Sequence, residues 1–336
     1  MVKVAVDAMG GDYAPEAIVR GAELAVREGT AAVVLVGDEH RIRPLLSADV
    51  DIEVVHAPTV VEMGESPSVV LRKKRDSSVN VALSLVKRGE AQAVVSAGNS
   101  GATMAFAIFT LGRIPGVDRP AILTFHTNVK GGVSILLDAG GTVDCKPVNL
   151  VQFGVMGSVF AHHVLGIEEP RVGVLSNGQE ETKGNELTRE ANALLKTVNI
   201  NYIGFIEGTD LYDGSAHVVV SDGFVGNVAL KVAEGVAEAI TGFMKERIMQ
   251  KARRKLGFLL LKDVFRELAK MTDYSEYGGG PLLGVEGTCI ICHGKSGERA
   301  IKNAIRLARD SVGHDIDEHL RDALQGFAAQ QKGKES

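Results

Sequence analysis

Seven times along this chain a short run rich in Val, Ile and Leu leads into a polar turn that contains glycine. The strand-and-turn segments are 3–12, 32–39, 93–101, 133–141, 171–180, 217–227 and 288–297. These runs are continuously apolar instead of alternating with polar residues, so each predicted strand is buried on both faces. The pattern therefore predicts an α/β fold, in which helices cover both sides of a parallel or mixed sheet.

Helix-like segments separate these strands. The predicted helices span residues 15–28, 79–87, 102–111, 148–165, 186–198 and 225–248. We expect one catalytic unit over residues 1–336, and a division into two subdomains around a cleft stays open. The polar end of the chain, residues 330–336, is predicted to be a flexible tail.

Polar side chains recur in the predicted turns. Ligands of open α/β sheets bind at the carboxyl ends of the strands, which is where these turns lie. The candidates are Asp7, Asp12, Ser96, Asn99, Ser100, Asp138, Asn177, Glu180, Asp222, Asn227, His293 and Ser296. Each Asp, Asn or Ser has an alternative role as a helix N-cap. Because several turns share the same chemistry, a common binding site is the favoured interpretation.

Residues 93–106, AVVSAGNSGATMAF, combine a strand end, a tight turn and a helix start. A helix N-terminus offers unpaired backbone N–H groups and the positive end of the helix dipole, both of which favour an anion. Gly98 and Gly101 let a ligand approach the backbone closely. The segment therefore predicts an anion-binding turn of a general kind.

Two basic features lie outside this turn. In the loop 176–186, SNGQEETKGNE, Lys183 precedes a predicted helix and can place a full positive charge in a cleft, although a solvated lysine is the alternative. The cluster Arg72, Lys73, Lys74 and Arg75 follows a Ser-Pro-Ser sequence and would attract an acidic partner. A solvated run of charges is its alternative.

Residues 245–275 are predicted to form a protruding helical hairpin that bends near Gly257. Its expected tip carries the apolar side chains Leu256, Phe258, Leu259, Leu260 and Leu261. Its basic flank consists of Lys251, Arg253, Arg254 and Lys255. Apolar residues with basic flanks suit an anionic membrane surface. A dimer interface or ordinary amphipathic packing is the alternative.

Composition narrows the class of protein. The net charge of -5, the absence of Trp and an aromatic content of 5% argue against a nucleic-acid partner. Three cysteines, Cys145, Cys289 and Cys292, are too few for a disulfide scaffold and indicate a reducing cytosol. No apolar run approaches the roughly 18 residues that span a bilayer. We expect a cytoplasmic protein that meets a membrane only at its surface.

Several familiar motifs are incomplete. The string Cys-x-x-Cys-His at Cys289 would need an exported protein to attach haem, and its two thiols point to opposite faces of a strand. A nucleotide-binding P-loop ending at Ser296 would need glycine at 289. A serine-hydrolase elbow at Ser100 would need glycine at Ala102. No cofactor and no metal-binding residue is predicted.

Ordered motifs over nearly the whole chain resemble a known family. They are VDAMGGDYAPE, PSVVLRKKRDSSVNVAL, SAGNSGA, LLDAGGTVDCKP, SNGQEETKGNE, SDGFVGNVALK, DYSEYGGGPLLGVEG and HGKS. With these motifs the chain resembles the bacterial phosphate acyltransferase family called PlsX. The resemblance implies a homodimer with a three-layer α/β/α sandwich, similar to isopropylmalate dehydrogenases and phosphotransacetylases.

The resemblance also implies a reaction. A long-chain fatty acyl group would pass reversibly from acyl-carrier protein to inorganic phosphate, giving acyl phosphate for phospholipid synthesis. The enzyme would lie at the inner face of the cell membrane and pass its product to the glycerol-3-phosphate acyltransferase PlsY. No cofactor is implied.

Phosphate is a nucleophile at neutral pH, so direct attack on the thioester is the predicted route. We expect Lys183 and the backbone N–H groups of Gly10, Gly11 and residues 98–101 to hold the phosphate. Asn177, Asn99 or His293 would donate to the oxyanion or protonate the thiolate. Gly178 and Gly223 complete the set of predicted substrate-binding residues.

Three other interpretations are left open. A cysteine could carry the acyl group covalently. A nicotinamide- and metal-dependent dehydrogenase of the related fold is a second, although no convincing G-x-G-x-x-G sequence is present. A non-catalytic membrane scaffold is the third.

Overall fold

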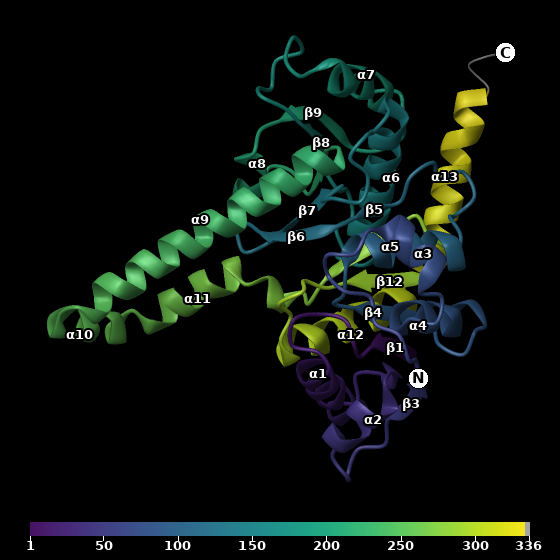
Figure 1. Ribbon diagram of the computed structural model, residues 1–336. Helices are drawn as coiled ribbons and strands as arrows, with labels where there is room; N and C mark the ends of the chain where they lie inside the picture. The colour runs from purple at the N-terminus through teal and green to yellow at the C-terminus, as the bar shows by residue number, and fades with distance from the viewer. Residues whose placement is uncertain (333–336) are drawn as a thin grey trace.

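Two mostly parallel sheets, each packed against helices, form the body of the protein (Figure 1). The structure is a computed structural model that describes residues 1–332, without the side chains of residues 269–272, 274 and 328–332. The predicted α/β class is confirmed. A single sheet was expected, and the seven predicted strands instead divide between the two sheets.

The first sheet contains four of the predicted strands at its centre. Its order is β3 (Glu53–His56), β2 (Ala32–Gly37), β1 (Lys3–Asp7), β4 (Ala93–Ser96), β12 (Thr288–Ile291), β11 (Gly280–Leu283) and β5 (Ala121–Ile122). All neighbours from β3 to β12 are parallel, while β11 is antiparallel to both β12 and β5. The carboxyl ends of β1, β4 and β12 therefore meet at one edge.

Helices cover both faces of this sheet. One face packs against α1 (Glu16–Arg27) and α12 (Glu298–Gly313), and the other packs against α4 (Ser78–Lys87) and α5 (Ser100–Thr110). Val4 and Val6 join the first core while Ala5 joins the second. Burial on both faces explains why the strands are continuously apolar.

The second sheet holds the other three predicted strands. Its order is β6 (Thr124–Thr127), β7 (Val133–Leu137), β10 (Val218–Val220), β8 (Val172–Leu175) and β9 (Tyr202–Ile206). Only β6 is antiparallel to its neighbour. One face packs against α6 (Pro147–His163) and α7 (Glu186–Leu195), and the other meets α8 (Asp210–Asp213).

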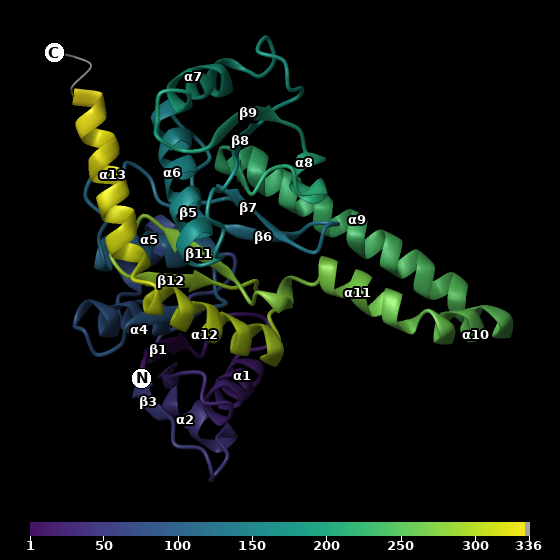
Figure 2. The same cartoon turned by 180° about the vertical axis from the view of Figure 1, so that it is seen from behind.

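Short elements complete the body. They are α2 (Glu39–Ile42), the 3₁₀ turn η1 (Arg43–Leu45) and α3 (Pro67–Lys73). The last helix, α13 (Ile316–Lys332), packs on α6 through Leu320, Leu324 and Phe327 (Figure 2). The predicted tail began at residue 330, but α13 continues to Lys332, and residues 333–336 lie outside the described part of the chain.

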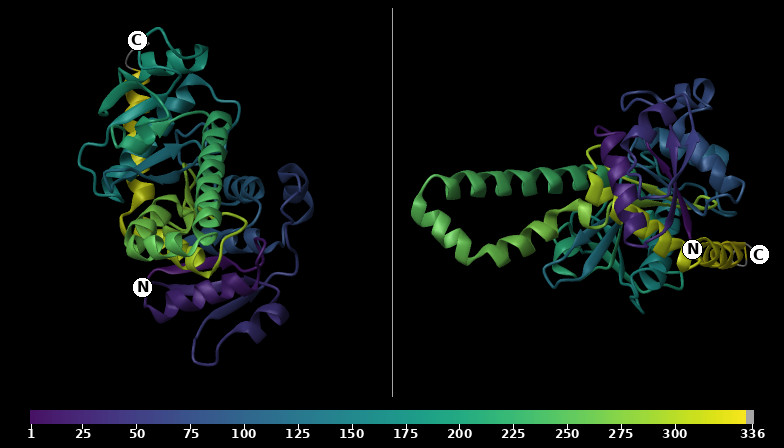
Figure 3. Two further views of the ribbon diagram at one scale, coloured as in Figure 1. Left: turned by 90° about the vertical axis from the view of Figure 1, so that its left-hand side faces the viewer. Right: turned by 90° about the horizontal axis from the view of Figure 1, so that it is seen from below.

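A long helical hairpin projects from the body, as Figures 1 and 3 show. It consists of α9 (Gly223–Met249), α10 (Ala252–Leu260) and α11 (Lys262–Thr272). The projecting part begins before the predicted residue 245, because α9 starts at Gly223 in the body and runs outward as one helix to Met249. Gly257 lies inside α10 and not at a bend; the chain turns at Gln250 and Lys251, and again at Leu261.

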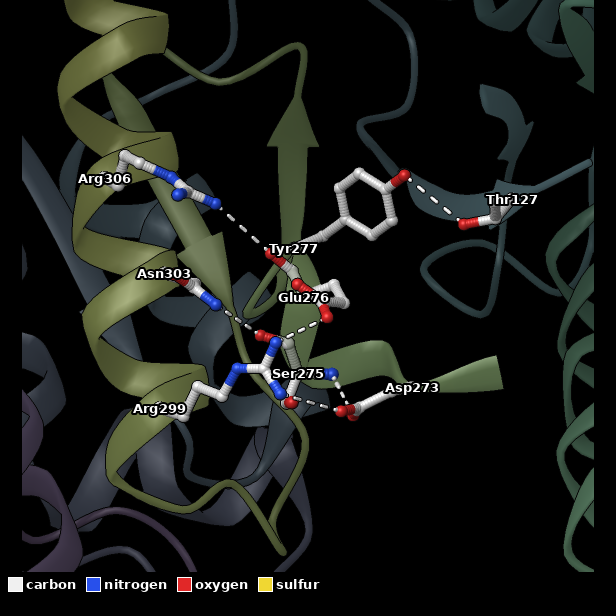
Figure 4. A network of polar contacts seen from close by, with 8 residues as sticks. All are labelled: Thr127, Asp273, Ser275, Glu276, Tyr277, Arg299, Asn303 and Arg306. Atoms are coloured by element: carbon white, nitrogen blue, oxygen red, sulfur yellow. Dashed lines mark hydrogen bonds and ion pairs between the residues drawn. The ribbon is translucent and has the colours of Figure 1, made fainter. Parts of the chain in front are cut away.

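A polar network holds the returning arm of the hairpin against α12 (Figure 4). Arg299 pairs with Asp273 and with Glu276. Asn303 Nδ2 donates to the carbonyl oxygen of Ser275 at 2.8 Å, within the stretch that follows α11. This anchoring fixes the chain just before Tyr277, which faces the cleft between the sheets.

Candidate functional site

A cleft of about 380 Å³ lies where the carboxyl ends of the two sheets face each other. Predicted site residues that line it are Asp12, Gly98, Ser100, Asn227 and His293. Further lining residues are Met63, Ile122, Thr124, Phe125, Ala139, Leu230, Lys231, Glu234, Tyr277, Gly278, Gly279, Gly280, Ile291, Cys292, Gly294 and Lys295. The cleft thus gathers turns from both sheets and the first turns of α9.

The turns after β1 and β4 are joined by a buried carboxylate. Ser96 Oγ donates to Asp7 Oδ2 at 2.7 Å, and the amide of Gly98 donates to Ser96 Oγ at 3.2 Å. Burial raises the pKa of Asp7, while hydrogen bonds from Ser78, Ser96, Met9 and Gly10 act in the opposite direction. Asp7 and Ser96 therefore set the shape of the turns beneath the cleft instead of lining it.

Two glycines let these turns approach each other. An ideal Cβ at Gly10 would lie 2.6 Å from Asp7 Oδ2 and 2.7 Å from the amide nitrogen of Gly98. Gly11 has φ of +109°, which non-glycine residues rarely adopt. The next amide, that of Asp12, donates to the carbonyl oxygen of Gly294 at 2.7 Å. The turn after β12 is thereby tied to the turn after β1.

Asn99 has a structural task at the start of α5. Its Oδ1 accepts from the amide of Ala102 at 3.0 Å, as an N-cap does. Its Nδ2 donates to the carbonyl oxygens of Met63 at 2.8 Å and Glu65 at 2.9 Å. Both amide hydrogens of Asn99 are therefore engaged, which leaves this side chain with no donor for an oxyanion. Ser100, in the first turn of α5, lines the cleft at the positive end of the helix dipole.

His293 and two lysines provide the polar chemistry of the cleft. His293 Nδ1 accepts from the amide of Lys295 at 3.1 Å, so a neutral ring carries its proton on Nε2. Lys231 Nζ lies 3.5 Å from that Nε2, to which it cannot hydrogen-bond in this tautomer because both groups donate, and it donates to Glu234 Oε2 at 2.7 Å. Partial burial lowers the pKa of His293, and the charge of Lys231 lowers it further. The imidazole is therefore neutral at pH 7 and presents an N–H donor.

The wall from the second sheet is organised by Asp138. This buried carboxylate accepts from the amides of Ile122 at 2.9 Å and Gly141 at 2.9 Å. Burial raises the pKa of Asp138, and the backbone hydrogen bonds oppose that shift. Asp222 caps α9 by accepting from the amides of Phe224 and Val225. Asp138 therefore shapes a turn and Asp222 caps a helix, which are the structural roles that the sequence offered as the alternative to ligand binding.

Glycine is required where α9 begins. An ideal Cβ at Gly223 would lie 2.7 Å from Asp138 Oδ2 and 2.7 Å from the carbonyl oxygen of Thr142. This close contact brings Asn227, one turn further along α9, into the cleft. Among the predicted residues on this wall, Asn227 is therefore the one that can reach a ligand.

The loop that carries Lys183 does not line the cleft. It follows β8, two strands from β7, so about 10 Å separates it from that strand across the sheet. Asn177 Oδ1 accepts from the amide of Gly184 at 2.9 Å, and the Lys183 amide donates to the carbonyl oxygen of Glu180. Gly178 packs against the side chains of Glu180 and Lys183. The structure therefore leaves these four residues together, but apart from the cleft.

Three cysteines and one serine are buried or half-buried near the cleft turns and cores. Burial raises the pKa of Cys145 and of Cys289 to about 12, and raises that of Cys292, which borders the cleft, further still. A thiol in this state is a poor nucleophile at neutral pH. Ser296, below the cleft, is buried, and among the described residues its Oγ has no hydrogen-bond partner.

Sequence reasoning missed Lys231, Glu234 and Tyr277. The two charged residues lie within a helix that was predicted, but the helix sequence alone does not show which face meets the cleft. Tyr277 stacks on Phe125 with ring centroids 4.6 Å apart, and this pairing depends on both sheets being in place. The sequence signal that could have pointed to Tyr277 is the run of three glycines that follows it in the motif DYSEYGGGPLL.

Comparisons with known proteins agree over nearly the whole chain. The model of the fatty acid synthesis protein family matches residues 2–319. The chain is 56% identical over 323 residues to the phosphate acyltransferase of Syntrophotalea carbinolica, covering 95% of this chain and 93% of that protein. It is 49% identical over 328 residues to the phosphate acyltransferase of Geobacter sulfurreducens, covering 96% and 94%.

Solved structures share the fold at low sequence identity. A phosphotransacetylase from Streptococcus pyogenes has a TM-score of 0.63 and 19% identity, covering 93% of this chain and 94% of that one. A 4-hydroxythreonine-4-phosphate dehydrogenase from Klebsiella pneumoniae has a TM-score of 0.54 and 16% identity, covering 92% and 98%. The structural likeness concerns the fold, whereas the family model and the relatives concern the sequence. The chain therefore belongs to the fatty acid synthesis protein family, and the resemblance that its ordered motifs carry is confirmed.

Proposed function

We propose that this protein is a phosphate acyltransferase that transfers a fatty acyl group from acyl-carrier protein to inorganic phosphate. The observation that carries the proposal is the cleft, where the N-terminus of α5 and two lysines surround a neutral histidine. An anion and a thioester carbonyl are the two groups that such a site can hold together. The named activity of the close relatives supports the same reaction.

In the proposed mechanism a phosphate oxygen attacks the thioester carbonyl carbon. The new C–O bond gives a tetrahedral oxyanion, which collapses as the C–S bond breaks. Acyl phosphate and the carrier thiolate result, and the thiolate takes up one proton. Holding phosphate against the carbonyl converts a bimolecular encounter into a step within one complex. Because phosphate is itself the nucleophile, no acyl-enzyme forms.

We assign to His293 the stabilisation of the negative charge that develops on the oxyanion. The Nε2–H of His293 can donate a hydrogen bond to the oxyanion and afterwards to the departing thiolate, which takes its proton from the hydrogen phosphate that attacked. Lys231 Nζ, 3.5 Å from the ring, supplies positive charge beside the same point. The backbone at Ser100 is assigned to the phosphate, as the first turn of α5 favours an anion.

The direct test is product formation by the purified protein. Incubated with palmitoyl-carrier protein and phosphate, it should form an acyl phosphate that hydroxylamine traps as the hydroxamate. Formation only in the presence of phosphate is the expected result. A scaffold would form no product, and a dehydrogenase would instead reduce a nicotinamide cofactor; either outcome would overturn the proposal.

Lys183 remains a proposed source of charge for the phosphate. It is half-buried, and among the described residues none pairs with its ammonium group. Lys183→Ala is expected to raise the KM for phosphate by no more than about tenfold, because its loop lies apart from the cleft and a charge about 10 Å away stabilises a dianion through space by roughly 1–2 kcal/mol at most. Initial rates over a phosphate titration measure this. If Lys183→Ala kept its phosphate KM and its turnover while Lys231→Ala lost activity, Lys231 alone would supply the positive charge for the phosphate.

The basic cluster on α3 is proposed to dock the acidic carrier protein. Arg72, Lys73 and Arg75 are exposed, whereas Lys74 turns inward, where its Nζ bonds to Glu65 at 2.6 Å and to the carbonyl oxygen of Val60. Lys74 therefore holds the loop instead of facing a partner. The start of α3 lies close to the first turn of α5, since an ideal Cβ at Gly101 would lie 3.1 Å from Pro67.

Reversing two of these charges tests the docking. Arg72→Glu combined with Arg75→Glu should raise the KM for carrier protein about tenfold, with little change in the phosphate KM, because rim charges steer encounter. The effect should shrink at high salt. Arg41→Glu, an exposed arginine on α2, is the control. Equal carrier KM values for the two variants would remove the cluster from the docking site.

The hairpin tip is proposed to contact an anionic membrane surface. Leu259, Leu260 and Leu261 are more than half exposed there, and Lys255 lies beside them. Phe258 packs on Phe265 with ring centroids 4.9 Å apart and is 37% exposed, less than the three leucines. No helix in the described part of the chain is long and apolar enough to cross a bilayer, so contact would be peripheral.

Replacing the three leucines by Glu should weaken binding to vesicles of anionic phospholipid at least tenfold. Each buried leucine contributes roughly 1.5–3 kcal/mol, and the new carboxylates are repelled. Flotation with the vesicles measures the bound fraction. Val129→Glu, at a site 70% exposed on the body, is the control. If the triple variant floats like the wild type, the hairpin serves another purpose.

Dimer formation and product transfer complete the proposal. An exposed apolar stripe on α9 supports the homodimer: Val225, Val228, Val232, Val236, Ile240 and Phe243. Their spacing of three and four residues places them on one face of the helix, which a second copy would cover. Acyl phosphate made near the membrane would then pass to PlsY.

A further inference from the structure

An apolar pocket of about 340 Å³ lies inside the hairpin, away from the cleft. Its lining residues are Thr241, Met244, Lys245, Ile248, Met249, Phe258, Phe265 and Leu268. They come from all three helices of the hairpin. Thr241 and Lys245 are the polar members, and the remaining side chains are apolar or aromatic. A pocket of this composition suits a hydrocarbon group better than an ion.

The pocket faces the space between the arms of the hairpin and not the exposed tip. Met244 and Ile248 are half-buried on the inner side of α9. Phe258 and Phe265, in contact with each other, come from α10 and α11. Leu260, by contrast, is 76% exposed at the tip. The hairpin therefore carries two separate apolar surfaces.

One face of α9 connects the pocket with the cleft. Near its start, Asn227, Lys231 and Glu234 line the cleft. Further along, Thr241, Lys245 and Ile248 line the pocket. Thr241, Lys245 and Ile248 follow Asn227, Lys231 and Glu234 by 14 residues each, which is close to four helical turns. All six residues therefore lie on the same side of α9. Exposed Glu238 stands on this side between the two sets of three, and half-buried Ala237 lies next to it. Ala237 is seven residues from Leu230 of the cleft and from Met244 of the pocket, so these three give the apolar route along the helix.

The distance along this face fits a long acyl chain. From Lys231 to Ile248 the helix rises about 25 Å, at about 1.5 Å per residue. A fully extended chain of single bonds spans about 1.2 Å per bond, judged from the extended polypeptide. A chain of about 12 bonds therefore reaches from Lys231 to Thr241, where the pocket begins, and one of about 21 bonds reaches Ile248 at its far end. A short acyl group stays within the cleft.

We propose that the pocket between α9, α10 and α11 binds the methyl end of the fatty acyl chain while its carbonyl carbon lies in the cleft. This inference rests on the acyl transfer proposed above. It gives the inner surface of the hairpin a role in selecting long substrates, separate from that of the leucines at the tip. Chain-length preference then depends on the depth of the pocket.

A tryptophan reporter tests occupancy directly, because the chain contains no Trp. Phe265→Trp places the only indole in the pocket, and Leu260→Trp places it at the exposed tip. Palmitate, added without vesicles or detergent, should shift the emission of the Phe265→Trp protein to the blue with saturation. Butyrate should not. An equal shift at Leu260→Trp would indicate adsorption to exposed leucines and overturn the assignment.

Filling the pocket tests its role in catalysis. Met244→Trp combined with Ile248→Trp should lower kcat/KM for palmitoyl-carrier protein at least tenfold, because each methylene kept in water costs about a fourfold factor. The value for butyryl-carrier protein should stay unchanged, which also shows that the variant folds. Val129→Trp, at a site 70% exposed on the body, is the control.

The outcomes separate this inference from the proposed function. If the wild type transfers neither acyl group, the proposed function fails. If the wild type transfers both and the double variant keeps the wild-type preference for palmitoyl, the pocket does not hold the chain. Equal losses for both chain lengths would likewise contradict it, since a short chain cannot reach Met244.

Discussion

Replacing His293 by Ala is expected to lower turnover by about 10²–10³-fold, the usual cost of removing an oxyanion donor. The hydrogen bond from the Lys295 amide to Nδ1 fixes the ring and its tautomer, so Nε2–H is the group presented to the substrate. Phosphate KM should change little, because the backbone of α5 remains. Single-turnover rates with palmitoyl-carrier protein separate chemistry from binding.

Two comparisons identify the role of His293. His293→Gln offers an amide N–H donor in place of the imidazole N–H, so partial recovery of turnover would indicate that His293 binds the oxyanion, and no recovery would count against that role. His40→Ala, at an exposed histidine on α2, is the control and should behave like the wild type. Turnover of His293→Ala within about threefold of wild type would contradict the assignment.

The pH dependence follows from the same residue. Partial burial, with the charge of Lys231, lowers the pKa of His293 below its ordinary value of 6.5. Nδ1 must carry no proton, because it accepts the hydrogen bond from the Lys295 amide that positions the ring. Activity should therefore be independent of this group at pH 7 and fall only as pH drops through the lowered pKa. His293→Ala should lack that acidic limb.

The strands were predictable because their signal is local. A buried parallel strand needs a continuous apolar run, and Val4, Ala5 and Val6 show why: successive side chains enter different cores. The division into two sheets was not predictable, because it depends on which strands are neighbours. β12 joins β4 across most of the chain length, and no local pattern records that pairing.

The candidate site was predictable at the level of turns but not of single residues. Asn99 and Asp222 have the polar chemistry of a site, yet each caps a helix. Sequence alone offered both roles for them. Lys231 was overlooked for the opposite reason, since it lies on a predicted helix with ordinary surface composition. Contacts between distant segments decide these cases, as the 3.5 Å approach of Lys231 to His293 illustrates.

Gly10→Ala is expected to cost most of the activity and part of the stability. The new methyl carbon would lie 2.6 Å from Asp7 Oδ2 and 2.7 Å from the amide nitrogen of Gly98, closer than real Cβ contacts. Neither neighbour can yield cheaply, because Asp7 is held by Ser96 and the nitrogen belongs to the backbone. Overpacking of this kind costs about 1–3 kcal/mol. The melting temperature should fall by several degrees.

The loss of turnover should exceed what the lost stability explains. Pushing Gly98 away from Gly10 moves the first turn of α5, and a displacement of about 1 Å in a positioning group can cost roughly 10²-fold in rate. Assays below the melting temperature of the variant measure this effect alone. Gly64→Ala is the matched control, because its Cβ would meet open space. If Gly10→Ala kept both its melting temperature and its turnover, the phosphate would not depend on the contact between these two turns, and another part of the cleft would have to hold it.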